Sequence, residues 1–297
     1  MIIDTHSHIS FKAYDDDRDE VIQRTQKEGV VCIDVGTKYE TSKRAIELAE
    51  KNNDIYAAIG MHPIHIKTDL LKIKMDEEEG AFAPLGEEYD KEKYKELAKS
   101  SKVVAIGEIG LDYYYRPKTT TRLEQFKELQ KKVFTEQLDL AKELDLPVII
   151  HCRMAHADVL DILKSQILNP NDQKLRGVIH CFTGSLEEAK KYMELGFYLG
   201  INGIIFSAFA KGYGGSSEAS SEGGKYATLE DVVKEIPLDK ILVETDCPYL
   251  TPPEAGAERN EPIFVKYVIQ KIADLKGMSF DGVTSATTEN AKKLFGI

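Results

Sequence analysis

Two histidines near the start of the chain have the type and spacing of metal ligands. The chain opens with Met1-Ile-Ile-Asp-Thr-His6-Ser-His8, an apolar run that ends in two histidines two positions apart. If this run is a β-strand, both imidazoles point to the same side. Two neutral imidazoles form half of a divalent-metal site, although histidines at strand ends are often ordinary surface residues.

The same arrangement recurs four more times. Apolar runs end in a side chain that can bind metal at Glu108, His151, His180 and Asp246. The alternative is that these are unrelated polar residues at strand ends, and five separate coincidences argue against it. We therefore expect a metal site made of His6, His8, Glu108, His151, His180 and Asp246.

The elements that must position these residues form a repeating pattern. Apolar, β-branched runs predict eight buried strands: Met1–His6, Val30–Gly36, Ile55–Gly60, Val103–Glu108, Pro147–His151, Gly177–Phe182, Phe197–Asn202 and Ile241–Asp246. Amphipathic patterns between them predict helices, among them Arg18–Glu28, Thr41–Lys51, Arg122–Leu144, Ala157–Ile167 and Leu186–Leu195. Eightfold strand–helix alternation is typical of a single-domain (β/α)₈ TIM barrel. A doubly wound open sheet is the other candidate, but it explains less well why ligands follow nearly every strand.

Two segments interrupt this alternation. Residues 66–95 are acidic with Pro and Gly, and residues 207–228 are rich in Gly and Ser. Both follow a strand, so we expect them to be insertions on the carboxyl-terminal face, where barrel enzymes carry their sites. The second insertion could be a lid over the substrate or an inert extension, and we favour the inert extension because longer loops cost little closure entropy.

The composition limits the class of protein. An apolar fraction of 42% and a charged fraction of 30% are ordinary for a globular chain. There is no apolar run of membrane-spanning length and no basic, leader-like start, so we expect a soluble, cytoplasmic protein that does not associate with a membrane. We expect no obligate protein partner. The net charge of −11 argues against broad nucleic-acid affinity but not against an enzyme whose metal ions supply positive charge.

The four cysteines do not suggest a disulfide framework. Cys32, Cys152, Cys181 and Cys247 include no C-x-x-C pair in this long chain. Three of them directly follow an expected ligand, and strand neighbours point to opposite faces. We expect reduced thiols that pack away from the metal.

The number of ligands indicates how many metal ions bind. Four imidazoles and two carboxylates suit zinc, manganese or a similar ion better than a site for magnesium alone. They are too many for one catalytic metal with three protein ligands and fit two divalent ions. We assign His6, His8 and Asp246 to one ion, His151 and His180 to the other, and Glu108 as the bridge.

The ordered motifs of the chain resemble the TatD family of metal-dependent deoxyribonucleases, which are amidohydrolase-type barrels. The resemblance rests on Asp4–His8, Gly60–Pro63, Ala105–Tyr114, His151–Arg153, His180–Gly184, Glu244–Leu250 and Arg259–Pro262, and it spans the whole chain. It implies the barrel fold, a two-metal site and nuclease activity on DNA. Two basic family motifs are altered, because Gly203–Phe206 leads into the Gly/Ser segment and Ala255–Glu258 replaces an Arg-Gly-Lys sequence.

The expected reaction is phosphodiester hydrolysis. A metal-bound hydroxide would attack phosphorus, Asp246 would act as the general base, and Glu108 would hold the ions together. His62 and Arg153 are expected to bind a substrate phosphate, although His62 could instead bond a loop and Arg153 could pair with Glu244 or Glu261.

Other residues near the motifs have expected supporting roles. Glu244 should orient a metal ligand, and Arg259 with Glu261 should hold the loop after the last strand. Of Tyr113, Tyr114 and Tyr115 at least two should pack in the core, although tyrosines can also stack on bases. We expect His65 and His156 to be ordinary loop or helix residues.

Two other functions stay open. One is hydrolysis of small esters or amides, including aminoacyl esters, with the same metals. The other is a non-catalytic metal-binding scaffold, against which the intact ligand set argues.

Overall fold

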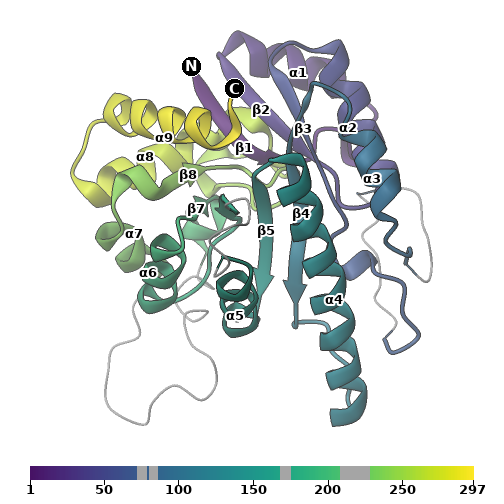
Figure 1. Cartoon of the computed structure of the whole chain (residues 1–297). Helices are drawn as coiled ribbons and strands as arrows, with labels where there is room; N and C mark the ends of the chain where they lie inside the picture. The colour runs from purple at the N-terminus through teal and green to yellow at the C-terminus, as the bar shows by residue number, and fades with distance from the viewer. Residues whose placement is uncertain (72–78, 80–85, 168–174, 208–227) are drawn as a thin grey trace.

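Eight parallel strands with helices around them make up a single barrel (Figure 1). The computed structural model describes residues 1–71, 79, 86–167, 175–207 and 228–297. The strands are β1 Ile2–Ser7, β2 Val30–Val35, β3 Ile55–Ile59, β4 Val103–Asp112, β5 Val148–Arg153, β6 Gly177–Ile179, β7 Tyr198–Ile201 and β8 Ile241–Val243.

The strands lie in chain order from β1 to β8, each parallel to the next. The sheet closes where Ser7, at the end of β1, forms a parallel bridge with Cys247, which follows β8. The Asp4 carboxylate strengthens this seam, because it accepts hydrogen bonds from the Thr245 N–H at 2.9 Å and the Thr245 hydroxyl at 2.6 Å. A doubly wound sheet would reverse its strand order, so that candidate fold is excluded and the predicted barrel is confirmed.

Helices alternate with the strands and cover the outside of the barrel. They are α1 Arg18–Lys27, α2 Tyr39–Lys51, α3 Lys91–Leu97, α4 Thr120–Leu144, α5 His156–Ile167, α6 Leu186–Glu194, α7 Leu229–Glu235, α8 Val265–Lys276 and α9 Phe280–Phe295. Within the described ranges, no helix combines the length and the apolar character that crossing a membrane requires.

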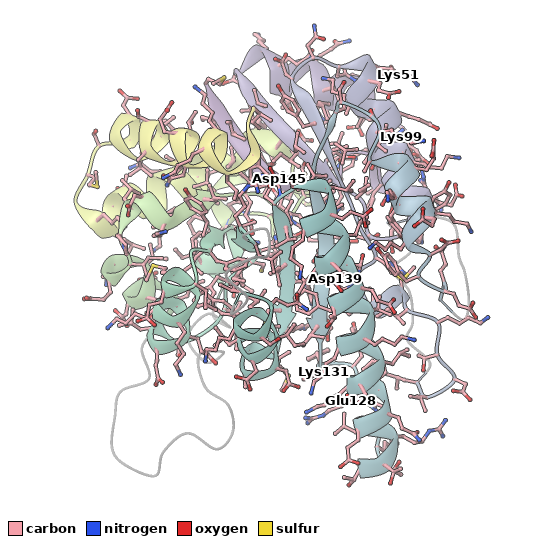
Figure 2. All side chains as sticks on the ribbon, in the orientation of Figure 1. Lys51, Lys99, Glu128, Lys131, Asp139 and Asp145 are labelled. Carbon is pink, nitrogen blue, oxygen red and sulfur yellow. The ribbon has the colours of Figure 1, made fainter. Side chains whose placement is uncertain are left out.

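The 25-residue helix α4 is the longest of these helices, and it extends beyond the carboxyl ends of β4 and β5 (Figure 1). Charged side chains, among them Glu128, Lys131 and Asp139, line it (Figure 2). Two buried glutamines connect it to the sheet. Gln137 exchanges two hydrogen bonds with the backbone of Met61, and Gln130 does the same with Asp112.

Apolar residues form one core inside the barrel and another between the strands and the surrounding helices. A smaller core cluster takes residues from all eight strands and from α9, including Ile3, Ile149, Leu242 and Phe295. Because every strand contributes, this cluster fills the barrel interior, and α9 covers its amino-terminal end in Figure 1. A larger cluster joins the outer strand faces to the helices. The packed interior leaves the carboxyl-terminal end as the place for a site.

Several predicted boundaries differ from the structure, among them the end of β6, which is Ile179 and not Phe182. Strand β4 continues to Asp112, beyond the expected end at Glu108, because Ile109–Asp112 pair with β5. Strand β8 ends at Val243, three residues before Asp246, whose φ of 59° is incompatible with a strand. Helix α3 begins at Lys91, inside the expected insertion 66–95. Almost all of the expected insertion 207–228 lies outside the described residues.

Candidate metal centre

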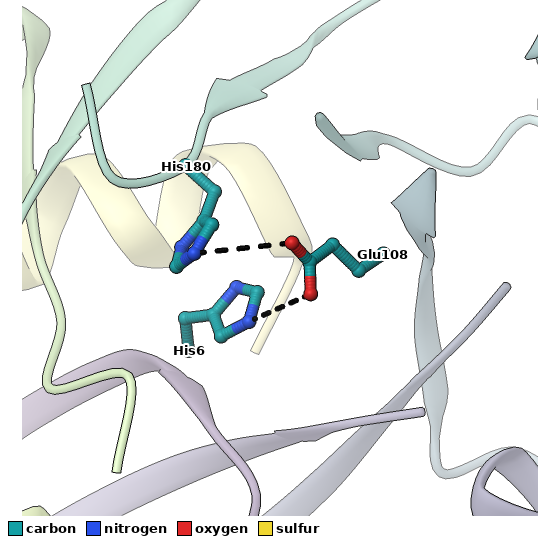
Figure 3. Close-up of side chains that lie close together, drawn as sticks. All are labelled: His6, Glu108 and His180. Atoms are coloured by element: carbon teal, nitrogen blue, oxygen red, sulfur yellow. Dashed lines mark ion pairs between the residues drawn. The ribbon is translucent and has the colours of Figure 1, made fainter. Parts of the chain in front are cut away.

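The carboxylate of Glu108 lies at the centre of the site, at the carboxyl-terminal end of the barrel. Its oxygens are 2.9 Å from His151 Nδ1, 3.5 Å from the Nε2 atoms of His6 and His62, and 4.0 Å from His180 Nε2. Figure 3 shows His6 and His180 side by side with both rings directed at Glu108. These rings stack at 3.5 Å between centroids. Four histidines from different strands and loops therefore converge on one buried carboxylate.

Second contacts orient two of the imidazoles toward the site. His8 Nδ1 lies 2.7 Å from the Val35 carbonyl oxygen, which can only accept a hydrogen bond, so Nδ1 carries the proton. His180 Nδ1 lies 2.9 Å from the buried Glu244 carboxylate. In both rings Nε2 is left facing the centre, which is the arrangement typical of histidine ligands to metal.

Asp246 completes the other side of the centre. Its Oδ1 lies 3.5 Å from His8 Nε2, 3.6 Å from His180 Nε2 and 3.8 Å from His6 Nε2. The left-handed backbone at Asp246 and a hydrogen bond from its N–H to the His6 carbonyl at 2.8 Å fix the turn that presents the carboxylate. The six expected ligands thus lie together, although the strand ends that carry them are far apart in sequence.

His151 lies between two carboxylates. Its Nδ1 faces Glu108, and its Nε2 lies 3.1 Å from Asp112 Oδ2. Burial opposes the charged imidazolium, but Asp112 and Glu108 outweigh it and raise the pKa of His151 to about 9. Asp112 was missed in the sequence because the strand was expected to stop at Glu108. The alternation of Glu108, Gly110 and Asp112 along one strand was the available signal.

His62 faces the centre as a neutral hydrogen-bond donor. Burial, and then the neighbouring His151, lower the pKa of His62 to about 3. Its Nδ1 accepts a hydrogen bond from the Ile64 N–H at 3.2 Å, so its proton is on Nε2, which points toward Glu108. The ring therefore bonds a loop, which was one of the two expected alternatives, and directs its Nε2–H toward Glu108.

The charges of the centre stabilise one another. Burial alone would favour neutral carboxyl groups, but the surrounding histidines hold the pKa of Glu108 well below its usual range and also lower that of Asp246. Burial likewise opposes a charged His180, yet Glu244 and Asp246 raise its pKa to about 10. A metal ion must therefore displace protons from His151 and His180 to bind there.

The donor set fits divalent metal ions. The Nε2 atoms of His6 and His8 face each other at 3.2 Å, a separation that suits a shared cation. The buried Nδ1 of His6 has no hydrogen-bond partner among the described residues. In the part of the chain that the structure describes, four overlapping sets hold their ligand atoms within 4.8 Å: His6, Glu108 and His180; His6, His8 and Asp246; His62, Glu108 and His151; and His180, Cys181 and Asp246.

The reason given for the cysteines does not hold at Cys181, and the expectation for the tyrosines is wrong. His180 and Cys181 follow the end of β6 and Cys181 has a φ of 46°, so strand alternation does not apply to Cys181, and its thiol lies within 4.8 Å of candidate ligand atoms of His180 and Asp246. Only Tyr113 of the three tyrosines is buried, whereas Tyr114 and Tyr115 are exposed, since they lie beyond the end of β4. All four cysteines are free, as expected.

Arg153 does not pair with Glu261, which was one of its expected partners. The Arg153 guanidinium lies 3.7 Å from the centroid of the Tyr114 ring, and no described carboxylate pairs with it. Glu261 instead pairs with Arg24 at 2.6 Å, and Arg259 pairs with Asp17 at 2.7 Å. These pairs fasten the loop after β8 to α1, which is the supporting role expected for Arg259 and Glu261.

A second buried polar cluster adjoins the centre and was missed in the sequence. The Glu79 carboxylate lies 2.9 Å from His65 Nε2 and 3.7 Å from the ammonium of Lys38, and it accepts a hydrogen bond from Thr37. His65 is therefore not an ordinary loop residue. The cluster joins residue 79 of the acidic segment to the loop after β2, whose Thr37 carbonyl accepts a hydrogen bond from the His62 N–H at 2.8 Å.

Comparisons with known proteins agree with this geometry. The family model described as TatD related DNase matches residues 3–296. The chain is 42% identical over 298 residues to the uncharacterized metal-dependent hydrolase YabD of Bacillus subtilis (strain 168), covering all of both chains. It is 33% identical to the 3'-5' ssDNA/RNA exonuclease TatD of Cronobacter sakazakii, covering 99% of this chain and 97% of that one. The crystal structure of the TatD homolog YJJV from Escherichia coli K12 superposes with a TM-score of 0.76 at 30% identity, covering 100% of this chain and 98% of that one. The chain therefore belongs to the TatD family of related DNases.

Proposed function

We propose that the protein is a divalent-metal-dependent hydrolase that cleaves phosphodiester bonds in DNA. The observation that carries the proposal is the contact of one buried carboxylate, Glu108, with four histidines at the carboxyl-terminal end of a barrel. The membership of the TatD family supports a nuclease, and one relative is named as an exonuclease acting on ssDNA and RNA.

The six expected ligands would hold two divalent ions, which could be zinc, manganese or magnesium. His6, His8 and Asp246 would bind one ion, His151 and His180 the other, and Glu108 would bridge them. The short distances from Glu108 to both groups of histidines support a bridging role. When bound, such ions polarise the phosphoryl group and lower the pKa of an attacking water.

The side chains of the protein would supply the remaining steps. Asp246 would accept the proton of the attacking water, because its low pKa keeps it ionised beside three imidazoles. His62 would donate its Nε2–H to a phosphate oxygen. Arg153 would bind the same or an adjacent phosphate, since stacking engages the face of its guanidinium and leaves its N–H edge free.

The test is a cleavage assay on metal-loaded protein. Labelled single-stranded DNA, duplex DNA, RNA, small phosphodiesters and small carboxylic or aminoacyl esters are compared, with and without a chelator. We expect chelator-sensitive cleavage of DNA, which Glu108→Ala abolishes. Cleavage of carboxylic esters but not of any phosphodiester would replace this proposal with the ester hydrolase, and no turnover of any substrate by a protein that retains metal would favour the scaffold.

A further inference from the structure

The connection between β4 and α4 carries exposed basic and aromatic side chains. Residues 113–122 contain three cations, Arg116, Lys118 and Arg122, and no acidic residue, in a protein with a net charge of −11. All three cations are exposed. Tyr114 and Tyr115, with 45% and 39% of their surface exposed, are among the few large hydrophobic side chains on the described surface.

These aromatic side chains form a defined surface. The guanidinium of Arg153 stacks on the Tyr114 ring at 3.7 Å, and the Tyr115 ring contacts Tyr114 edge-on at 5.1 Å between centroids. The stack limits the rotamers of Tyr114 and Arg153, so a planar ligand would meet a partly ordered surface. We call Tyr114, Tyr115 and Arg153 the aromatic platform.

The platform is joined to the metal centre by short links. The Tyr114 N–H donates a hydrogen bond to Asp112 Oδ1 at 2.8 Å, and the other oxygen of Asp112 lies 3.1 Å from His151. Arg153 is two residues after His151 and pairs in register with Asp112. A chain held at the metal centre by one phosphate could therefore place a neighbouring base on the platform.

We infer that the platform binds an unpaired nucleobase of a single-stranded nucleic acid, next to the scissile phosphate. This inference rests on the proposed function and assigns a base-binding surface beside the metal centre. Aromatic rings bind bases of any type by stacking, and exposed cations bind the backbone between them. The faces of a base inside a duplex are covered by its neighbours, so only an unpaired or terminal base can reach Tyr114. Arg116 and Lys118 would bind the phosphates that follow.

The experiment measures whether one base contributes to binding through Tyr114. Short phosphorothioate deoxythymidylate strands, which resist cleavage, carry a fluorescent label and a single abasic residue at successive positions. Their affinity for the metal-loaded protein is measured by fluorescence anisotropy, and cleavage is measured on the phosphodiester versions and on the same strand in a duplex. The variants are Tyr114→Ala, Tyr114→Leu and Tyr114→Phe. Tyr56→Ala is the matched control, because Tyr56 also lies under a cation, Lys102 at 5.0 Å, but at the opposite end of the barrel.

The parent should lose at least about fivefold in affinity when the base at one position is removed. Tyr114→Ala and Tyr114→Leu should bind the intact and abasic strands equally, while Tyr114→Phe and Tyr56→Ala should discriminate as the parent does. Tyr114→Leu keeps apolar bulk, so it decides the question if Tyr114→Ala fails to fold.

The platform is overturned if Tyr114→Leu still binds the intact strand more tightly than the abasic strand. It is also overturned if the parent binds both strands equally, even if cleavage occurs. Conversely, discrimination that depends on Tyr114 without any cleavage supports the platform and contradicts the proposed chemistry. If the parent binds and cleaves duplex and single strands equally, that result would also contradict the platform.

Discussion

The buried carboxylate of Glu244 lies against the ring of His180, with 2.9 Å between Oε1 and Nδ1. The same oxygen accepts hydrogen bonds from the Cys181 N–H at 2.7 Å and from the Asn202 amide at 3.1 Å. Glu244 is therefore fixed in the loop after β8 while it orients a ring that follows β6. Strand β6 ends at Ile179, so the strand itself does not fix the ring of His180. The contact with Glu244 holds the ring in one orientation instead.

Replacing Glu244 with Gln should weaken metal binding without unfolding the protein. The amide keeps the shape of the side chain but removes the charge that makes His180 basic, and such second contacts are typically worth about 10- to 100-fold in metal affinity. Competition with a chelator of known affinity measures the effect. Gly200→Ala should act in the same direction, because its added Cβ would collide with Glu244 Oε2. Unchanged metal affinity in both variants would show that Glu244 has no role in positioning His180.

Glu108→Ala should lose more metal than the replacement of any single histidine. Its carboxylate lies near His6, His151 and His180, so its removal affects the ligands of both proposed ions. Elemental analysis of purified variants gives the metal content per chain. A Glu108→Ala protein that keeps two ions, when His151→Ala loses one, would rule out a bridging carboxylate.

Asp246→Asn should retain at least one ion and lose turnover by about 10²- to 10⁴-fold, because an amide cannot accept the proton of the attacking water. Metal content and cleavage rate are measured on the same preparation, so that loss of metal is not mistaken for loss of the base. Activity within tenfold of the parent would remove Asp246 from the general-base role.

The parts predicted from sequence are those that depend on local patterns. Strand periodicity and ligands such as His6 and His180 at strand ends were sufficient to place the barrel and to bring the six ligands together. Asp112 was missed because the continuation of β4 depends on pairing with β5, which no local pattern reveals. The burial of Glu79 against His65 and Lys38 is likewise a contact between distant segments. The exposure of Tyr114 follows from where β4 ends rather than from its aromatic character.

The buried cluster around Glu79 predicts a stability effect with a defined pH dependence. Burial disfavours the Glu79 carboxylate, but His65, Lys38 and Thr37 outweigh it and lower its pKa from 4.5 to about 2. Because the folded state holds the charged form, the stabilisation is complete above the unfolded pKa and disappears as the pH falls from 4.5 toward 2. Glu79→Gln should therefore lower the free energy of unfolding by about 3 kcal/mol at neutral pH, and this difference from the parent should shrink below pH 4.5.

Denaturant unfolding of the parent and the variant at a series of pH values measures this difference. Glu88→Gln is the matched control, because Glu88 belongs to the same acidic segment but pairs with Lys67 at 3.0 Å on the exposed surface. That exposed pair should contribute well under about 1 kcal/mol at every pH. If Glu79→Gln and Glu88→Gln have equal, small effects, the carboxylate of Glu79 does not stabilise the fold. If the effect of Glu79→Gln is large but constant down to pH 2, lost packing rather than the ion pair with His65 and Lys38 is its cause.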